Sequence, residues 1–353
     1  MKKISVIVAF CLFLSGCFNY KEIRDSAVVT AISIDVSDSA KYKVGAEVVK
    51  AGDMGDSLEN EVLSVDCNSL TEGLSEIVKL VNKNVYLGYC ELIIIGERFA
   101  ERGISDILDY FIRNTEYRND LLVFISKDSE AKAILNTKNI EEKIIGHGLS
   151  DSLKADDDYQ ATSVYSKLYK IMNDTKPDNC SSMISVLKNE SNNDEEIIKI
   201  SGSAYFKGDK ILGFLSENDT FFINLLNNRV KLGNFTVKYD DELLGVRLLD
   251  SFCNINLVEN RVKINLQLSV AVTEDNNRSE NEENYNMIIS NDVKTKITRL
   301  LDETIKYKKA DLVGLYSKVN LSEELFHEFL SETEKEIDVS VKIKGSGINE
   351  YYS

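Results

Sequence analysis

The pattern of apolar and polar positions in the first part of the chain predicts strands that precede a helix. Apolar residues alternate with polar ones over residues 41–50, and with the apolar segment 26–35 they predict two strands joined by a polar loop. Apolar residues three and four positions apart then predict a helix over residues 70–81. Ser69 and Glu72 have the spacing of a capping box at the start of this helix.

The pattern continues as an alternation of strands and helices. Short β-branched runs at residues 89–96 and 121–126 predict buried strands. Helical spacing follows each run, over residues 97–120 and 129–137, and residues 141–174 are also mostly helical in pattern. Strands that alternate with helices indicate an α/β first domain.

The second half of the chain predicts a further mixed domain. Residues 197–216 form a predicted hairpin, with Gly208 and Asp209 in a tight turn. The other predicted elements are helices at 217–228, 286–308 and 322–336 and strands at 234–239, 252–259, 261–274 and 337–347. The expected fold class is therefore multi-domain α/β, with mixed sheets and packed helices.

Segment 188–196 is the most polar stretch in the middle of the chain, and its composition is typical of a flexible segment. We interpret it as a linker or loop. The predicted organisation is a signal peptide over residues 1–16, an N-terminal α/β domain or domains over 17–187, and a C-terminal α/β domain over 197–353.

The first residues indicate an export signal that ends at a cysteine. Two lysines precede an apolar run, Ile4–Leu14, and small residues lead to Cys17. The run is too short to span a bilayer core of about 30 Å. Residues 14–17, Leu-Ser-Gly-Cys, resemble the bacterial lipobox, in which the cysteine is acylated. We therefore predict lipid attachment at Cys17, against the alternative of a plain signal peptide that contains a cysteine.

The net charge of the chain limits how it could bind to a membrane. The whole sequence has a net charge of −16, and removal of residues 1–16 leaves −18 (40 − 58). This charge argues against binding to nucleic acid and against an electrostatic grip on anionic lipid. The acyl group would therefore anchor the protein alone.

The remaining cysteines do not indicate a site. Cys67, Cys90, Cys180 and Cys253 are widely spaced and include no Cys-x-x-Cys pair. Buried thiols are the favoured interpretation, although an exported protein can form disulfides and spacing cannot assign them.

No pattern of residues predicts catalysis, a metal or a cofactor. His147 and His327 lie far apart, without the spacing of a zinc site. The acidic run 156–158 lacks the ligand spacing of an EF-hand, and the glycine-rich run 52–57 lacks a phosphate-binding order. We expect a protein that is not an enzyme, with apolar groups of the hairpin 205–214 as candidates for a protein interface.

Several segments together resemble the Ger(x)C lipoproteins, the C subunits of the nutrient germinant receptors of spore-forming Gram-positive bacteria. They follow in order along the chain: CFNYKEIRDSAVVTAISID, LIIIGERFAERGISDILDYFIRNTEYRND, ISGSAYFKGDKILGFLS, KADLVGLYSKV and IDVSVKIKGSG. The chain departs from the family at Phe18 and Phe214, where tryptophan is common.

The resemblance implies a lipoprotein on the extracytoplasmic face of the spore inner membrane. It would act beside a membrane-spanning A-type subunit and a transporter-like B-type subunit. We therefore expect a lipid-anchored, non-enzymatic receptor subunit that supports assembly or signalling during spore germination. The alternative is a solute-binding lipoprotein that senses or delivers a small molecule, which would need a cleft between domains. A hydrolase would lack a recognisable nucleophile.

Overall fold

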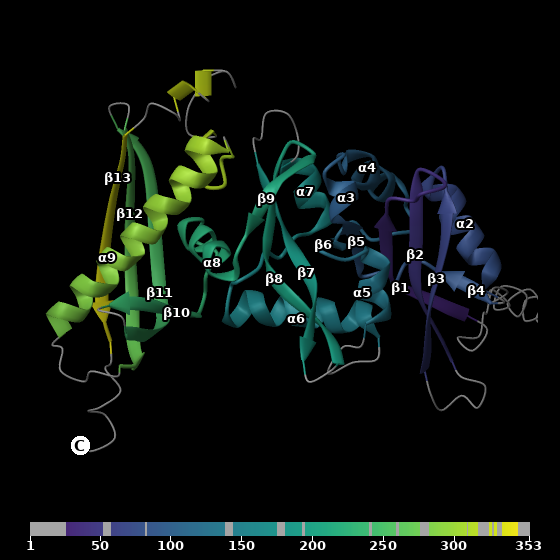
Figure 1. The fold of residues 1–353 in the computed structure, drawn as a ribbon, viewed down its shortest axis with the longest axis horizontal. Helices are drawn as coiled ribbons and strands as arrows, with labels where there is room; N and C mark the ends of the chain where they lie inside the picture. Colours follow the sequence, from purple (N-terminus) through teal and green to yellow (C-terminus); the bar gives the residue numbers. More distant parts are fainter. Residues whose placement is uncertain are drawn as a thin grey trace, which may run out of the picture.

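The structure, a computed structural model, forms two units along the long axis of the molecule (Figure 1). Each unit is built on one sheet. The residues that the structure describes are 26–51, 58–81, 83–137, 144–174, 181–192, 195–239, 242–258, 261–275, 282–308, 310–316, 325–326, 328–329 and 334–344.

The first sheet has a parallel centre between two antiparallel edges. Its strand order is β3-β2-β1-β5-β6-β7-β8-β9, and β4 pairs with the start of β1. The strands β1, β5, β6 and β7 run parallel to one another. The bounds are β1 Ser26–Asp35, β2 Tyr42–Ala51, β3 Leu58–Cys67, β4 Asn84–Tyr86, β5 Leu92–Gly96, β6 Leu122–Ser126, β7 Ser182–Asn192, β8 Glu195–Lys207 and β9 Lys210–Leu215.

Helices cover both faces of the parallel centre. The strands β5 and β6 are buried at every position, which explains why their sequences are continuous apolar runs. One face packs against α2 (Leu70–Leu80), α3 (Glu97–Ala100), α4 (Ser105–Arg113) and α7 (Leu168–Asp174). The other face packs against α5 (Ala131–Asn136) and α6 (Ile145–Tyr159).

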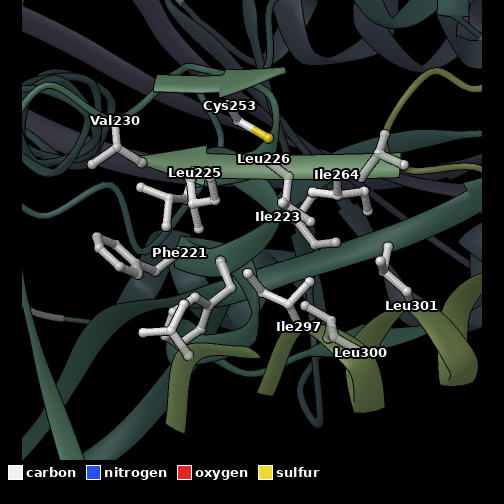
Figure 2. Close-up of a cluster of buried hydrophobic side chains, with 14 of the residues drawn as sticks. Phe221, Ile223, Leu225, Leu226, Val230, Cys253, Ile264, Ile297, Leu300 and Leu301 are labelled. Carbon is white, nitrogen blue, oxygen red and sulfur yellow. The ribbon is translucent and has the colours of Figure 1, made fainter. Parts of the chain in front are cut away.

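The second sheet has the order β10-β11-β12-β13, with β13 parallel to β12. Helix α9 crosses one of its faces, and α8 lies between the two units (Figure 1). Their apolar side chains meet in one core, in which Ile223 of α8 lies near Ile297 of α9 and Leu226 and Leu300 belong to the same cluster (Figure 2). The bounds are α8 Glu217–Leu226, β10 Gly233–Tyr239, β11 Glu242–Val258, β12 Arg261–Glu274, α9 Glu282–Leu301 and β13 Glu334–Ile343; a π-helix, η2, spans Asp302–Tyr307.

The predicted α/β fold is confirmed, and several boundaries differ. The helix predicted over residues 97–120 is divided into α3 and α4 at Gly103, whose φ of +121° no helix contains. Strand β11 begins at Glu242, ten residues before its predicted start. The strand β3 was not predicted, because most of its positions are exposed or half-buried and show no apolar face.

The segment 188–196 does not connect the two units. Residues 188–192 belong to β7 and pair with residues 195–199 of β8, so the segment is the end of a hairpin in the first sheet. The segment is polar because it forms the exposed end of the β7–β8 hairpin, not because it is a linker between the units. The chain passes from the first sheet to the second through α8, and the division into domains at 187 and 197 stays a prediction.

A buried carboxylate joins β2 to the start of α6. Glu47 is fully buried and accepts hydrogen bonds from the backbone N–H groups of Ile145, at 2.7 Å, and Gly146, at 2.9 Å. The Thr30 hydroxyl donates to Glu47 Oε2 at 2.6 Å, and the Asn60 amide donates to Oε1 at 3.2 Å. Four donors therefore surround one carboxylate, and two of them are N–H groups that a helix start leaves without intrahelical partners.

Replacement of Glu47 by glutamine should destabilise the protein. The glutamine amide keeps one oxygen but turns an NH₂ group toward buried donors, so we expect a loss of about 2 kcal/mol in the free energy of unfolding. Denaturant unfolding followed by circular dichroism measures it. The control Glu61→Gln alters an exposed side chain on β3 and should change stability by less than about 0.5 kcal/mol. Equal effects of the two substitutions would contradict the assigned role of Glu47.

Candidate functional site

A cavity of about 280 Å³ opens at the carboxyl ends of β1, β5 and β6. The wall is formed by the carboxyl ends of β1 and β5, by α3, and by the loop that joins β6 to α5. The lining residues are Asp35, Val36, Gly96, Glu97, Arg98, Phe99, Asp128, Ser129 and Glu130. Its size suits a small solute rather than a cofactor or a peptide.

The topology of the first sheet creates this cavity. After β1 the chain continues to β2 and β3 on one side, and it returns through α2 to β5 on the other side of β1. The connections that leave the carboxyl ends of β1 and β5 therefore diverge. Open α/β sheets bind ligands in the crevice at such a point, outside the carboxyl ends of the strands.

Asp35 is the buried acid of the cavity. Its carboxylate accepts hydrogen bonds from the N–H groups of Ala131, at 2.8 Å, and Lys132, at 2.9 Å, at the start of α5. Burial raises the pKa of Asp35 above its ordinary value, although these two donors oppose the shift. A Cβ atom at Gly96 would collide with Asp35 Oδ1, so the end of β5 has to be glycine for the carboxylate to lie there.

The rim of the cavity is mainly acidic. Glu97, Asp128 and Glu130 join Asp35 in the lining, and Arg98 is the one basic residue among the described lining residues. Asp128 has a φ of +62°, and its N–H donates to Glu97 Oε2 at 3.3 Å. Lys43 reaches Glu130 at 3.2 Å from outside the lining. This charge balance favours a cationic or dipolar solute over an anion.

The lining has the chemistry of a binding site. Among the described residues of the lining, the one hydroxyl side chain is that of Ser129, which lies 3.1 Å from the Ser126 hydroxyl. In the part of the chain that the structure describes, no group of three His, Cys, Asp or Glu side chains is placed to hold a metal ion.

The residues that the sequence singled out do not converge on this cavity. Cys17, Cys180, His327 and the run 52–57 lie outside the described residues. His147 lies in the first turn of α6, where its Nδ1 is 2.5 Å from Glu91 Oε1, so it neighbours a carboxylate and no nucleophile.

The described cysteines are interior residues. Cys67, Cys90 and Cys253 are all buried, as the sequence predicted. Burial raises the pKa of Cys90 to about 12, so its thiol remains protonated at neutral pH and is a poor nucleophile.

The acidic run 156–158 has a structural role. Asp156 accepts hydrogen bonds from the N–H groups of Thr162, at 3.3 Å, and Ser163, at 2.8 Å. The Asn224 amide of α8 in turn donates to the carbonyl of Ala161 at 2.9 Å and to that of Ser163 at 2.7 Å. Asp156 therefore fixes the turn that follows α6, and α8 is hydrogen-bonded to this turn.

The hairpin proposed as an interface is part of the interior instead. Tyr205 and Phe206 of β8 are buried, and Phe214 of β9 is half-buried beneath Lys127, whose ammonium lies 4.2 Å from the ring centroid. The aromatic residues of this hairpin are therefore core residues, and the expected apolar surface is absent from its described residues.

Sequence reasoning missed the cavity because it searched for groups that act chemically. One signal was present: Asp35 ends an apolar strand, Glu97 follows the apolar run 89–96, and Asp128 and Glu130 follow the run 121–126. Polar residues after successive parallel strands meet at one edge of the sheet.

The part of the chain that the structure describes contains no helix with the length and apolar character needed to cross a bilayer.

Comparisons with known proteins place the chain near spore germination proteins. A family model described as spore germination protein N-terminal domain matches residues 19–188, and one described as spore germination B3/GerAC like, C-terminal, matches residues 201–347. Together they cover most of the chain, and they divide it close to the predicted domain boundary.

Three relatives are distant in sequence. Spore germination protein KC of Bacillus subtilis (strain 168) is 26% identical, over 42% of this chain and 38% of that protein. Spore germination protein GerQC of Bacillus cereus is 24% identical, over 67% of this chain and 64% of that protein, so both matches span less than two thirds of the relative. Spore germination protein B3 of Bacillus subtilis (strain 168) is 23% identical over 98% of both chains.

A solved structure has the same fold. The crystal structure of the GerBC protein superposes with a TM-score of 0.58 at 18% sequence identity, over 89% of this chain and 96% of that chain.

The buried acid of the cavity should give a pH-dependent contribution to stability. Because the pKa of Asp35 is raised above 3.8, the folded protein binds this proton more tightly than the unfolded chain. The associated stabilisation is present below the unfolded value and is lost as the pH rises through the raised value. As the pH rises from strongly acidic to neutral, the Tm of the wild type should therefore fall relative to the Tm of Asp35→Asn.

Thermal unfolding at several pH values measures this difference. The matched control is Asp38→Asn, an exposed aspartate in the following turn, whose Tm should remain parallel to that of the wild type. A wild-type advantage over Asp35→Asn that grows toward neutral pH would show that the assigned direction of the Asp35 shift is wrong.

Proposed function

The chain belongs to the family of GerAC-like spore germination proteins, and on this premise we propose that it is the lipid-anchored, non-enzymatic C-type subunit of a germinant receptor. It acts at the extracytoplasmic face of the spore inner membrane, where it supports assembly or signalling with membrane-spanning A-type and B-type subunits. The observation that carries the proposal is the match of two successive spore germination models across most of the chain.

The lipid anchor rests on the sequence around Cys17. A diacylated cysteine supplies the two chains that stable anchoring needs, since each buried CH₂ contributes about 0.8 kcal/mol. Without residues 1–16, the net charge of −18 (40 − 58) gives the chain no electrostatic attraction to anionic lipid, so the acyl chains account for the attachment. Tethering also raises the effective concentration of the folded units near membrane partners, so contacts of modest affinity suffice.

The non-enzymatic role agrees with how the described polar groups are used. The buried carboxylates of Asp35, Glu47 and Asp311 each accept backbone N–H groups, which makes them structural acceptors. A general base or nucleophile needs a lone pair directed at a substrate instead.

The cavity at the carboxyl ends of β1, β5 and β6 favours a second candidate function, the sensing of a small solute. It lies within the first unit, not in the cleft between domains that the sequence argument required. Its acidic rim matches dipolar solutes with an ammonium group, such as amino acids, better than it matches sugars.

Removal of the acylated thiol should detach the protein. We expect Cys17→Ala to lose membrane association in flotation assays, to reduce nutrient-triggered germination, and to lose the co-purification of membrane-spanning partners from detergent extracts. The matched control is Cys11→Ala, which lies in the predicted signal peptide and should behave as the wild type. A Cys17→Ala protein that stays on the membrane with normal germination would contradict the anchor.

The sensing function is tested by calorimetry. Titration of the purified protein with amino acids should give saturable heat, and Glu97→Lys, which reverses a charge in the lining, should weaken it at least tenfold. The control Glu101→Lys makes the same change at an exposed position outside the lining. Equal weakening by both, or no heat with the wild type, would rule out this cavity as the sensor.

A further inference from the structure

Three large apolar side chains are exposed where the first unit begins. Leu80 is 57% exposed, Tyr86 is 55% exposed and Tyr89 is 59% exposed, and they come from a segment of ten residues at the end of α2 and around β4. We name these three residues the β4 rim. Large apolar groups so close in sequence are normally turned into a core, as Val85 and Leu87 between them partly are.

The two tyrosine rings of the β4 rim are held outward as a pair. Their centroids are 5.3 Å apart, at an angle of 54° between the ring planes. Gly88 lies between them in sequence, and a Cβ atom there would come within 3.1 Å of the Tyr86 ring, so the glycine allows the ring to lie against the backbone. The exposure is therefore built into a defined local arrangement.

The β4 rim lies at the amino end of β1. Strand β4 pairs with the first residues of β1, with Asn84 beside Ser26 and Tyr86 beside Val28. Figure 1 shows β4 at the end of the molecule that is farthest from the second sheet.

The path to the anchor is short. Cys17 precedes Ser26 by nine residues, and nine residues span at most about 30 Å. An acylated Cys17 therefore keeps the amino end of β1, and the β4 rim beside it, within about the thickness of a bilayer core from the lipid surface.

The local charge permits this approach. Residues 76–89 carry Glu76, Lys79 and Lys83 as their charged side chains, a net charge of +1 in a chain of net charge −16. Within residues 76–89, basic side chains therefore outnumber acidic ones, unlike in the chain as a whole. Tyrosine is also enriched at membrane interfaces, because its ring is apolar and its hydroxyl remains in contact with water.

We propose that the β4 rim is a lipid-contacting surface that orients the first unit on the membrane to which Cys17 anchors it. The proposal rests on the anchoring function, since without the tether three side chains give little affinity for a bilayer. It also orients the cavity: β1 has 10 residues, about 30 Å in length, and the cavity lies at its opposite end. The cavity therefore opens away from the lipid.

A single tryptophan tests the contact, because the chain has none of its own. The acylated full-length protein carrying Tyr89→Trp is reconstituted into vesicles of phosphatidylcholine and phosphatidylglycerol, with and without bromine on the acyl chains. We expect a blue shift of the emission on reconstitution and loss of most of the emission in brominated vesicles. Tyr86→Trp is a second reporter in the same rim.

The matched control is Tyr159→Trp, at the end of α6. Tyr159 is 62% exposed, so its tryptophan should report water and remain unquenched. Flotation of the same samples, and of a Cys17→Ala version, reports the anchor separately.

The outcomes separate the two proposals. If flotation requires Cys17 but the emission of both rim tryptophans is not quenched, the rim contact is overturned and the anchor stands. Quenching with flotation independent of Cys17 overturns the anchor and supports the rim contact. Absence of both flotation and quenching overturns both proposals, and equal quenching of the Tyr159→Trp control overturns the specific orientation.

Discussion

The rest of the structure depends on the buried carboxylate of Glu47, because it fixes where α6 begins. Helix α6 packs on one face of the first sheet and ends at the turn that Asp156 holds. Asn224 of α8 then binds the carbonyls of that turn, which links α6 to the core of the second unit. One helix, fixed by a carboxylate at each end, therefore sets the position of the second unit relative to the first. Figure 1 shows this path from β1 past α6 to α8.

A buried carboxylate that accepts backbone N–H groups is also present in the second unit. Asp311 is buried, and its carboxylate accepts the backbone N–H groups of Val313, at 3.3 Å, and Tyr316, at 2.7 Å. Burial raises the pKa of Asp311, as it does at Asp35. Asp311 closes an irregular segment and Asp35 caps the start of α5, and each buried carboxylate accepts two backbone N–H groups. Such sites are costly to leave unsatisfied, so they specify one backbone path more strictly than apolar packing does.

The sequence predicts the fold well where the local pattern of apolar residues reflects burial. It predicts the fold poorly where burial depends on residues far away in the chain. The strands β5 and β6 can be recognised from their continuous apolar runs, because both faces of these strands are covered. The edge strand β3 cannot be recognised in this way, because most of its residues are exposed or half-buried. The role of Asp35 could not be read from the sequence, since its partners at Ala131 and Lys132 lie almost a hundred residues away. The aromatic hairpin near Tyr205 has the composition of an interface and is interior because Tyr205 packs in the core with α8 and Phe206 packs in the core of the first sheet.

The parallel pairing of β13 with β12 determines the order in which the second unit can be completed. Residues 261–270 pair with residues 334–343, which follow α9 in the chain. If the chain crosses a membrane in the amino-to-carboxyl direction, as the proposed anchor requires, β12 presents one open edge with unpaired backbone groups until β13 emerges. On that route the strands of the first sheet, which end at residue 215, are all available before the second unit can be completed.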